Sequence, residues 1–409
     1  MHGFPLQNGQ LPEGVPHTRK MEKGKFLQWP KGLLSTIRNG FRADGEDRGF
    51  RIEEFGFESA ATEASTDNNN ELILHDEDML LHDAGIAENR RFTYQVFVPV
   101  ERRDERKAIL LLHGLNERNW DKYHHWAEYL ALNTGKPVIL FPIAFHMNRG
   151  PSAWLNPRSM NRVAETRRRK SGNPGSLTFA NAVLSERLTE EPLRFYHSGR
   201  QTIHDISALT RQIGNGEHPL FPSGTTPDLF AYSIGSFLAE ILLMANPGNL
   251  FSSSKLFIFC GGAIFRHMYG ESKHIMDKVA YERLLQYYCE EWFSPSENNP
   301  DSTPKEEDAL ARAFSAMISP DIYQEEREHF FDAWKRRISG ISLLKDKVMP
   351  FSGVEACMGK KLAGECFEIL DFPFEYSHET PFPASGRADL RLVEASFREV
   401  FRKSAAFLA

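Results

Sequence analysis

The chain has 409 residues, enough for one large α/β domain with insertions or for two ordinary domains, and this length excludes a small disulfide-stapled module. Hydrophobic residues make up 41% of the chain and charged residues 25%, which excludes global disorder and a coiled-coil rod. The net charge of −6 is mild, and no basic stripe is large enough to bind a phosphate backbone. We therefore expect no nucleic-acid partner.

The cysteines and the apolar stretches bound the chemistry and the compartment. The four cysteines have neither CxxC nor Cys/His ligand spacing, so we expect free thiols, no disulfide framework and no metal. Residues 1–20 lack the apolar segment of a secretory signal, and no stretch offers about 18 uninterrupted apolar residues. This pattern predicts a cytoplasmic protein without a membrane span. The dense basic run at residues 167–170 adjoins Gly and Pro and is predicted to be a solvated loop.

The first half of the chain indicates a layered α/β fold. Residues 1–91 are rich in Gly, Pro, Asn and charge, and we expect an N-terminal extension packed on the core, with a loop signal at residues 66–70 and a strand-like piece at 50–57. Alternating apolar residues predict a strand at 92–98, and continuous apolar runs predict buried strands at 108–112 and 136–145. Helical spacing over 121–133 separates those two buried strands.

The second half repeats that rhythm around two interruptions. Residues from about 150 to 195 are predicted to be a loop-like or weakly helical insertion, and residues 266–337 a helical cap that contains an acidic linker at 294–308. Between and after them the expected elements are helix 201–213, strand 227–232, helix 235–246, strands 255–260, 340–344 and 366–370, and helix 387–407. The fold class is therefore α/β with a mostly parallel, doubly wound sheet, whose core comprises residues 92–265 and 338–409.

A serine lies at the junction of a predicted strand and a predicted helix. Ser233 follows the buried strand and precedes an apolar helix, so a tight turn would push its hydroxyl out of the sheet. Ala231 and Gly235 supply the small residues that such a turn needs, because the strand and helix backbones nearly touch there. This context predicts a nucleophile elbow; the alternative is a serine that only caps the helix.

A serine hydroxyl is a weak nucleophile, so it needs a base and a group that orients the base. In an open α/β sheet both should follow later strands, at the edge where ligands bind. Asp346 occupies the first loop position after the strand at 340–344, and His378 lies in the loop after the strand at 366–370. The alternatives are a solvated turn acid and an ordinary loop histidine. Three further acids remain candidates for the orienting role: Asp371, Glu375 and Glu379.

An attacked acyl carbon also needs donors for its negative oxygen. The turn that begins with His113 and Gly114 follows an early buried strand, and Gly114 allows the backbone to approach a substrate closely. We expect the backbone N–H groups of Leu115 and Ile234 to form an oxyanion hole, supported by His113, Gly114 and Gly235.

These motifs together resemble the α/β-hydrolase superfamily. The likeness rests on residues 110–115, 231–235 and 346–350 and on His378, in the chain order Ser, Asp, His that the superfamily uses. It implies a catalytic triad in which His378 takes the Ser233 proton, Asp346 orients the imidazole and an acyl-enzyme forms, with no metal or organic cofactor. Ala231 replaces the usual glycine, and residues 148–152 only faintly match an RGxGxS loop. These departures predict that the chain belongs to a bacterial branch of the superfamily other than those of its best-known members.

Ester cleavage is the commonest outcome of such a triad, so the leading hypothesis is a carboxylic-ester hydrolase that is esterase- or lipase-like. We expect a small-molecule ester or acyl substrate, and a monomer or homodimer. The same parts could serve a peptidase, thioesterase, carbon–carbon hydrolase or acyltransferase, or belong to a non-catalytic binding protein. Aromatic residues of the cap either face the substrate or merely pack the lid: Tyr281, Tyr287, Tyr288, Trp292 and Phe293.

Overall fold

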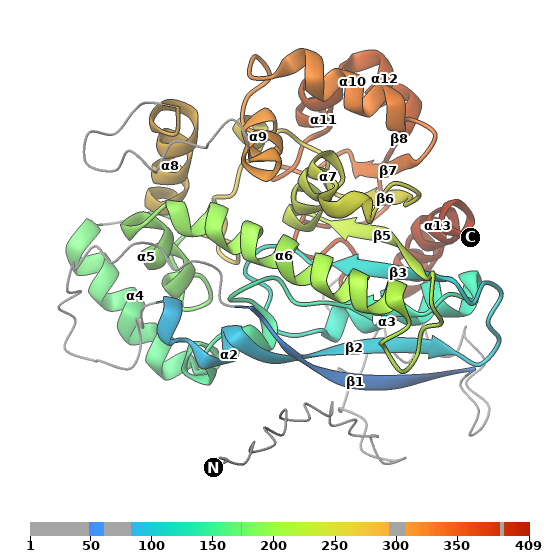
Figure 1. Ribbon diagram of the computed structural model, residues 1–409. Helices are drawn as coiled ribbons and strands as arrows, with labels where there is room; N and C mark the ends of the chain where they lie inside the picture. Colours follow the sequence, from blue (N-terminus) through green and yellow to red (C-terminus); the bar gives the residue numbers. More distant parts are fainter. Residues whose placement is uncertain (1–48, 61–82, 173, 294–307, 385–387) are drawn as a thin grey trace, which may run out of the picture.

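The computed structural model describes residues 49–60, 83–172, 174–293, 308–384 and 388–409. Within these residues, eight strands form one sheet in the order β1-β2-β4-β3-β5-β6-β7-β8 (Figure 1). The loop signal at residues 66–70 and the linker at 294–307 lie outside the described residues. The strands are β1 (Phe50–Glu58), β2 (Arg91–Pro99), β3 (Lys107–Leu112), β4 (Val138–Leu140), β5 (Thr226–Tyr232), β6 (Leu256–Phe259), β7 (Ile338–Leu343) and β8 (Phe367–Leu370).

The direction of the strands identifies the topology. β1 pairs antiparallel with β2, and β2 pairs antiparallel with β4. Every later neighbour pair, from β4 with β3 through to β7 with β8, is parallel. Helices connect the parallel strands, as crossover connections require. The expected α/β-hydrolase fold is confirmed.

Helices cover both faces of the sheet, because the buried strands are apolar on both sides. Alternate residues of β5 show this division: Leu229 and Ala231 belong to the core under α6 and α7, whereas Phe230 and Tyr232 belong to the core under α3 and α13. The long helices are α3 (Asp121–Thr134), α6 (Leu193–Asn215), α7 (Ile234–Ala245) and α13 (Leu390–Leu408). The shorter elements are η1 (Asp83–Gly85), α2 (Ala87–Arg90), η2 (Met147–Arg149), η3 (Ser152–Leu155), η4 (Pro247–Asn249) and η5 (Phe265–His267).

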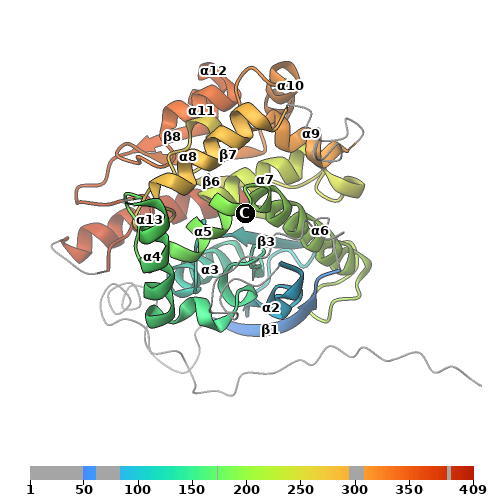
Figure 2. The same cartoon turned by 90° about the vertical axis from the view of Figure 1, so that its left-hand side faces the viewer.

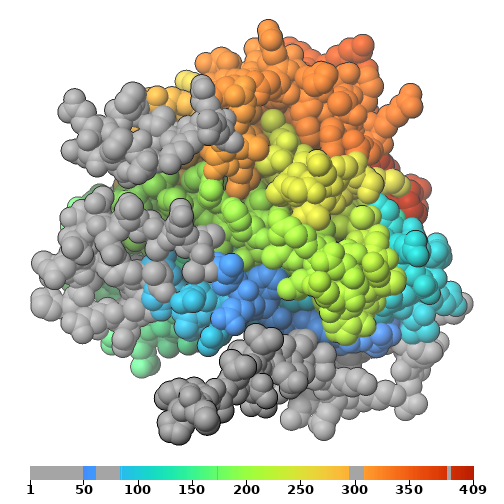
Figure 3. Space-filling model, in the orientation of Figure 1, coloured from blue at the N-terminus to red at the C-terminus, as the bar shows by residue number. Residues whose placement is uncertain are grey.

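The sheet begins earlier than the expected core boundary at residue 92. β1 pairs with the whole length of β2, from Phe50 opposite Pro99 to Glu58 opposite Arg91. Phe57 of β1 packs against Phe92 and Phe141, with ring centroids 5.3 Å apart in both pairs. In the space-filling view, β1 (blue) runs along the lower part of the face shown (Figure 3). The strand-like piece predicted at 50–57 is therefore an edge strand of the central sheet.

The insertion between β4 and β5, predicted to be loop-like or weakly helical, is helical. It contains α4 (Pro157–Ser171) and α5 (Ala182–Glu190), and α6 begins at Leu193 rather than at residue 201. The α4 helix starts where Asn156 accepts hydrogen bonds from two backbone N–H groups and proline occupies the first helical position. The apolar run at 136–145 yields only the three-residue strand β4, because the chain then turns away, with Phe145 at a φ of 65°.

The basic run at residues 167–170 is not a solvated loop. It lies in the last turns of α4, and Arg167 is fully buried. The Arg167 guanidinium pairs with Asp277 and donates to Glu186 at 2.8 Å. Because a buried charge needs compensation, these two carboxylates explain how arginine can occupy the interior. Asp277 also accepts the N-terminal hydrogen bond of α8 (Lys278–Gln286), so the Arg167 cluster joins α4 to α8.

The helical segment predicted at residues 266–337 follows β6 and precedes β7. Its described helices are α8, the π-turn η6 (Tyr287–Glu291), α9 (Ala309–Ala316) and α10 (Gln324–Trp334). Two helices that sequence reasoning missed follow β7: α11 (Phe351–Met358) and α12 (Lys360–Cys366). Figure 2 views the molecule from the side on which α4, α5 and α8 lie.

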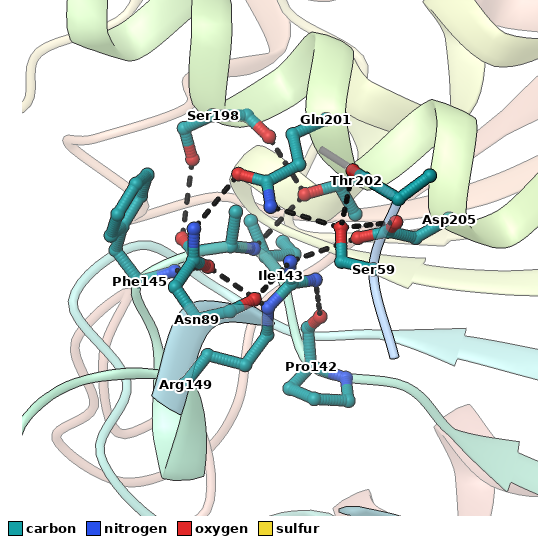
Figure 4. A network of polar contacts seen from close by, with 12 residues as sticks. Ser59, Asn89, Pro142, Ile143, Phe145, Arg149, Ser198, Gln201, Thr202 and Asp205 are labelled. Atoms are coloured by element: carbon teal, nitrogen blue, oxygen red, sulfur yellow. Dashed lines mark hydrogen bonds and ion pairs between the residues drawn. The ribbon is translucent and has the colours of Figure 1, made fainter. Parts of the chain in front are cut away.

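A buried polar network fastens the turn after β4 to its neighbours (Figure 4). The Arg149 guanidinium donates to Asp205 at 2.8 Å and to Asn89 Oδ1 at 3.1 Å. Asp205 also accepts a hydrogen bond from Ser59, which follows β1, and Asn89 donates to Gln201 of α6. Burial lowers the pKa of Arg149 to about 10, which still leaves the guanidinium charged at neutral pH. The network therefore ties β1, α2, α6 and the turn after β4 together.

Candidate active site

Ser233 occupies the sharp turn between β5 and α7. Its φ of 57° and ψ of −128° belong to a strained backbone conformation, of the kind found at functional sites. A Cβ at Gly235 would lie 2.7 Å from the backbone oxygens of Leu112 and His113. The end of β3 and the start of α7 therefore approach so closely that only glycine fits, as the motif predicted.

The structure brings the three predicted side chains into one hydrogen-bonded chain. Ser233 Oγ lies 2.7 Å from His378 Nε2, and His378 Nδ1 lies 2.7 Å from Asp346 Oδ2. All three residues are at most 4% exposed, so the chain is shielded from bulk water. The alternative acid Asp371 instead accepts a hydrogen bond from Tyr376 and pairs with Lys345. Of the acids considered, Asp346 is the one bonded to the His378 ring.

The turn after β7 holds the Asp346 carboxylate in place. Its Oδ1 accepts hydrogen bonds from the backbone N–H groups of Val348 and Met349, both at 2.9 Å. Hydrogen bonds from N–H groups to an ionised carboxylate are among the stronger ones. Oδ2 is left for His378, so each carboxylate oxygen has a defined partner. Burial and then the nearby Asp346 charge raise the pKa of Cys260 well above the ordinary thiol value.

Tyr232, directly before the serine, positions the histidine loop. Its hydroxyl donates to the backbone oxygen of His378, and its ring stacks on the His378 ring with centroids 5.5 Å apart. Lys122 Nζ lies 4.6 Å from the centroid of the Tyr232 ring and donates to the Glu379 carbonyl at 3.3 Å. Sequence reasoning missed this role, because Tyr232 and His378 are 146 positions apart.

The loop after β3 presents the predicted oxyanion donors. Ile234 is the first residue of α7, so its N–H has no acceptor within the helix. Within the described part of the chain, neither this N–H nor that of Leu115 donates to a protein acceptor. Gly114 N–H is taken up by Tyr123 Oη at 2.9 Å. The N–H groups of Leu115 and Ile234 are thus backbone donors without a protein acceptor among the described residues.

His113 holds the same loop as a neutral imidazole. Its Nε2 accepts from Ile143 N–H at 2.9 Å, so the proton is on Nδ1, which donates to the Gly114 carbonyl at 2.8 Å. Complete burial lowers the pKa of His113 well below its ordinary value, which keeps the ring uncharged. The predicted supporting role of His113 is thus given a physical basis.

Asn116 holds the loop after β3 from the other side, and sequence reasoning missed it. Its φ of 59° is left-handed, a conformation that asparagine tolerates better than most residues. Its Nδ2 donates to the carbonyls of Ala180, at 2.8 Å, and His274, at 2.6 Å. One side chain thereby connects the loop to the segment before α5 and to the segment before α8. An asparagine directly after the Gly-Leu of this loop was the only available signal.

Apolar cavities adjoin the serine. Ser233 lines one of about 500 Å³, together with Tyr281 and Leu284 of α8. Of the cap aromatics considered above, Tyr281 therefore faces the site. Tyr288 and Trp292 are buried and bonded within the protein, to the Pro192 carbonyl and to Ser315 Oγ. These two aromatics therefore pack within the protein, whereas Tyr281 lines the cavity that contains Ser233.

The described residues hold no sign of a metal site, a disulfide or a membrane span. The four cysteines are free. In the ranges that the structure describes, no group of three His, Cys, Asp or Glu side chains could hold a metal ion. No helix in those ranges is both long enough and apolar enough to cross a membrane.

Comparison with known proteins places the chain in a family. Residues 51–409 match the family model described as a family of unknown function (DUF6051). The chain belongs to this family. The match begins at the second residue of β1, so the DUF6051 unit includes the edge strand as well as the parallel sheet. No curated protein matches the chain in sequence.

Solved structures similar to this DUF6051 chain are remote. An esterase of Pyrobaculum calidifontis is 10% identical over 92% of this chain and 89% of its own, with a TM-score of 0.38. The peroxisomal alpha-beta-hydrolase Lpx1 of Saccharomyces cerevisiae is 12% identical over 88% and 89%, also with a TM-score of 0.38. Carboxyl esterase 2 of Tuber melanosporum is 13% identical over 78% and 81%, with a TM-score of 0.37. The fold assignment rests on the strand order and directions, not on these scores.

Proposed function

We propose that this protein is a serine hydrolase that cleaves carboxylic esters through an acyl-enzyme on Ser233. The observation that carries the proposal is the buried chain of hydrogen bonds from Ser233 through His378 to Asp346, with 2.7 Å at each link. Two further features support it. The serine stands on a strained elbow, and the backbone donors Leu115 and Ile234 beside it have no protein acceptor among the described residues.

The first half of the proposed reaction forms the acyl-enzyme. Ser233 Oγ attacks the ester carbonyl carbon while His378 Nε2 takes the hydroxyl proton. The N–H groups of Leu115 and Ile234 bind the resulting oxyanion. The bond between the carbonyl carbon and the alcohol oxygen then breaks, and His378 gives its proton to that oxygen. Asp346 keeps the Nδ1 proton in place and stabilises the imidazolium.

The second half releases the acid. His378 takes a proton from a water molecule, whose oxygen attacks the acyl carbon in the same oxyanion site. The bond between that carbon and Ser233 Oγ breaks, the serine regains its proton from His378, and a carboxylic acid leaves. Residues 266–337 act as a cap over this site in the proposal, because Tyr281 and Leu284 of α8 line the cavity that contains Ser233.

The test is hydrolysis of p-nitrophenyl esters of increasing acyl length, combined with labelling by a fluorophosphonate. We expect turnover and a label on the wild-type chain, and we expect Ser233→Ala to abolish both. His378→Ala should reduce kcat by a factor on the order of 10³ or more, and Asp346→Asn by a comparable factor.

A matched control is available in β7. Ser342 is fully buried, and its hydroxyl has no hydrogen-bond partner among the described residues, so Ser342→Ala removes a buried serine outside the proposed chemistry. This variant should keep wild-type labelling and turnover. A well-folded wild-type chain that neither hydrolyses any ester in the series nor accepts the label would contradict the proposal and favour a binding protein of the same fold.

A further inference from the structure

Two apolar cavities meet at the proposed oxyanion donors. The first has a volume of about 520 Å³ and lies among α6, α7 and α9. The second, of about 500 Å³, extends from Ser233 towards α8 and the turn after β7. We call them the α6–α9 cavity and the α8 cavity. The side chains of the α6–α9 cavity include Ile203, Phe237, Leu238, Ile241, Leu310 and Phe314. Those of the α8 cavity include Phe265, Met268, Met276, Leu284, Leu285 and Met349.

Of the polar side chains that line the α6–α9 cavity, those of Ser198, Tyr196 and Arg200 are hydrogen-bonded within the protein, whereas His146 Nε2 has no partner among the described residues. Ser198 Oγ donates to the Ala144 carbonyl at 3.2 Å. Arg200 donates to Tyr196 Oη at 3.0 Å and pairs with Asp308, which caps α9. A hydrocarbon group entering this cavity would lose water without displacing a hydrogen bond, whereas a polar group would find His146 Nε2 as the side-chain atom not already bonded among the described residues.

The junction of the two cavities coincides with the place where a substrate carbonyl would bind. Leu115, Phe195 and Ile234 line both cavities, and Leu115 and Ile234 carry the two backbone donors of the proposed oxyanion hole. An ester whose carbonyl oxygen lies between those donors has two substituents that diverge from one carbon. With one cavity on each side of the junction, each substituent has an apolar space of its own.

Building on the proposed function, we infer that the substrate is an ester with an extended apolar group on both sides, its acyl chain in the α6–α9 cavity and its alcohol group in the α8 cavity. The assignment of the alcohol group to the α8 cavity follows from the proton that the leaving alcohol must receive from His378. Ser233, Val348 and Met349 line the α8 cavity. The backbone N–H groups of Val348 and Met349 donate to Asp346, which is hydrogen-bonded to His378. The alcohol group therefore lies on the histidine side.

Phe195 contacts side chains of both cavities. Its ring contacts Phe237 and Phe314 of the α6–α9 cavity, with centroids 6.2 and 6.4 Å away. On the other side it contacts Phe265 of the α8 cavity, with centroids 5.6 Å apart. Phe195 is thus an aromatic side chain that lines both cavities.

The experiment measures kcat/KM for four esters: methyl acetate, methyl hexanoate, hexyl acetate and hexyl hexanoate. Burial of one methylene should raise kcat/KM about fourfold. Methyl hexanoate should therefore exceed methyl acetate by a factor on the order of 10², and hexyl acetate, whose alcohol has one further methylene, by a factor on the order of 10³. Hexyl hexanoate should show both gains, because independent sites contribute additively.

Two filling variants assign the cavities. Leu238 lines only the α6–α9 cavity and Leu284 only the α8 cavity. Leu238→Trp should reduce the gain from a hexanoyl group at least tenfold and leave the gain from a hexyl alcohol within about threefold, and Leu284→Trp should do the reverse. Each variant's own kcat/KM for methyl acetate is the reference from which its gains are calculated. If a tryptophan variant fails to fold, Leu238→Ala and Leu284→Ala, which enlarge the same cavities, should extend the chain length accepted on the corresponding side.

A gain from only one of the two substituents would overturn the inference, as would variants that affect both substituents equally or in the opposite assignment. The binding of 7-tridecanone, a ketone with a hexyl group on each side of its carbonyl, separates this inference from the proposed function. Calorimetry on Ser233→Ala should detect binding that each filling variant weakens at least tenfold. Binding without ester turnover by the wild type would retain the two cavities and reject the hydrolase; turnover without ketone binding would reject the two cavities alone.

Discussion

Replacing Gly235 by alanine perturbs the closest approach in the site. The added Cβ would lie 2.7 Å from the backbone oxygens of Leu112 and His113. An ordinary contact between such atoms requires roughly 0.8 Å more. These neighbours are backbone atoms of β3 and of the loop after β3, so the strand end and α7 must separate. The separation would move Leu115 N–H away from Ile234 N–H, and these are the two donors that must act on one oxygen.

The separation of β3 from α7 in Gly235→Ala should reduce both the folding free energy and kcat. Overpacking of this kind costs about 1–3 kcal/mol of folding free energy, which lowers the thermal midpoint of a chain of this size by roughly 1–4 °C. A misplacement approaching 1 Å in a catalytic group can cost on the order of 10² in rate, and we expect kcat for p-nitrophenyl butyrate to fall by about that factor in Gly235→Ala. The matched control is Gly364→Ala, because Gly364 lies in α12 and a Cβ added there would have no neighbouring atom within 4 Å.

Calorimetric melting and steady-state kinetics on the two variants give the answer. Gly364→Ala should keep wild-type kcat and gain up to about 1 kcal/mol of stability from the helix preference for alanine. Wild-type melting and wild-type kcat in Gly235→Ala would refute the reasoning, because they would mean that the elbow has room for a methyl group.

Three further predictions concern positioning and ionisation. In steady-state assays, Asn116→Ala should lower kcat by about tenfold or more at nearly unchanged KM. The loop after β3 would lose two hydrogen bonds, and alanine tolerates the left-handed φ of this position less well than asparagine does. An unchanged kcat would contradict this prediction. Burial raises the pKa of Glu240, whose carboxylate has no partner among the described residues, so the folded state retains the proton and unfolding is favoured as the pH rises above about 4.5. In denaturant titrations, the wild type should lose roughly 1.4 kcal/mol of unfolding free energy per pH unit in this range, and Glu240→Gln should not show this loss. If the unfolding free energies of the two proteins change in parallel with pH, the prediction is wrong. Burial lowers the pKa of His218 to about 4, so the unfolded state takes up a proton first as the pH falls below about 6.5. The wild type should therefore lose about 2 kcal/mol of stability by pH 5, and His218→Phe should not lose it. Equal losses in the two proteins would show that His218 is protonated in the folded state.

The parts of the fold that sequence reasoning anticipated are those with local signals. Strands β3 and β5 are continuous apolar runs, and the elbow at Ser233 follows from a strand, a helix and a small residue within a few positions. Asp346 and His378 were found because each follows a strand at the edge where the loops gather. In these cases the information lies within one segment of about ten residues or in the order of the segments.

The parts that were missed depend on partners far away in the chain. Arg167 was assigned to solvent because basic residues in a run usually are, yet its carboxylate partner Asp277 lies 110 positions later. The α4 helix has a weakly apolar sequence, and it is stabilised by contacts with α5 that no local pattern reveals. Tyr232 looks like an ordinary core residue until the loop that carries His378 packs against it. Such roles are tertiary, and one sequence without the fold does not contain them in readable form.

The most direct test of the central claim is to trap the covalent intermediate. Wild-type protein mixed with p-nitrophenyl butyrate and quenched with acid within milliseconds should gain the mass of one butyryl group, and peptide mapping should locate it on Ser233. His378→Ala should show little of this adduct, because the hydroxyl proton would have no acceptor. A wild-type chain that hydrolyses the ester without any acyl group on Ser233, or that carries the group on another residue, would contradict the account.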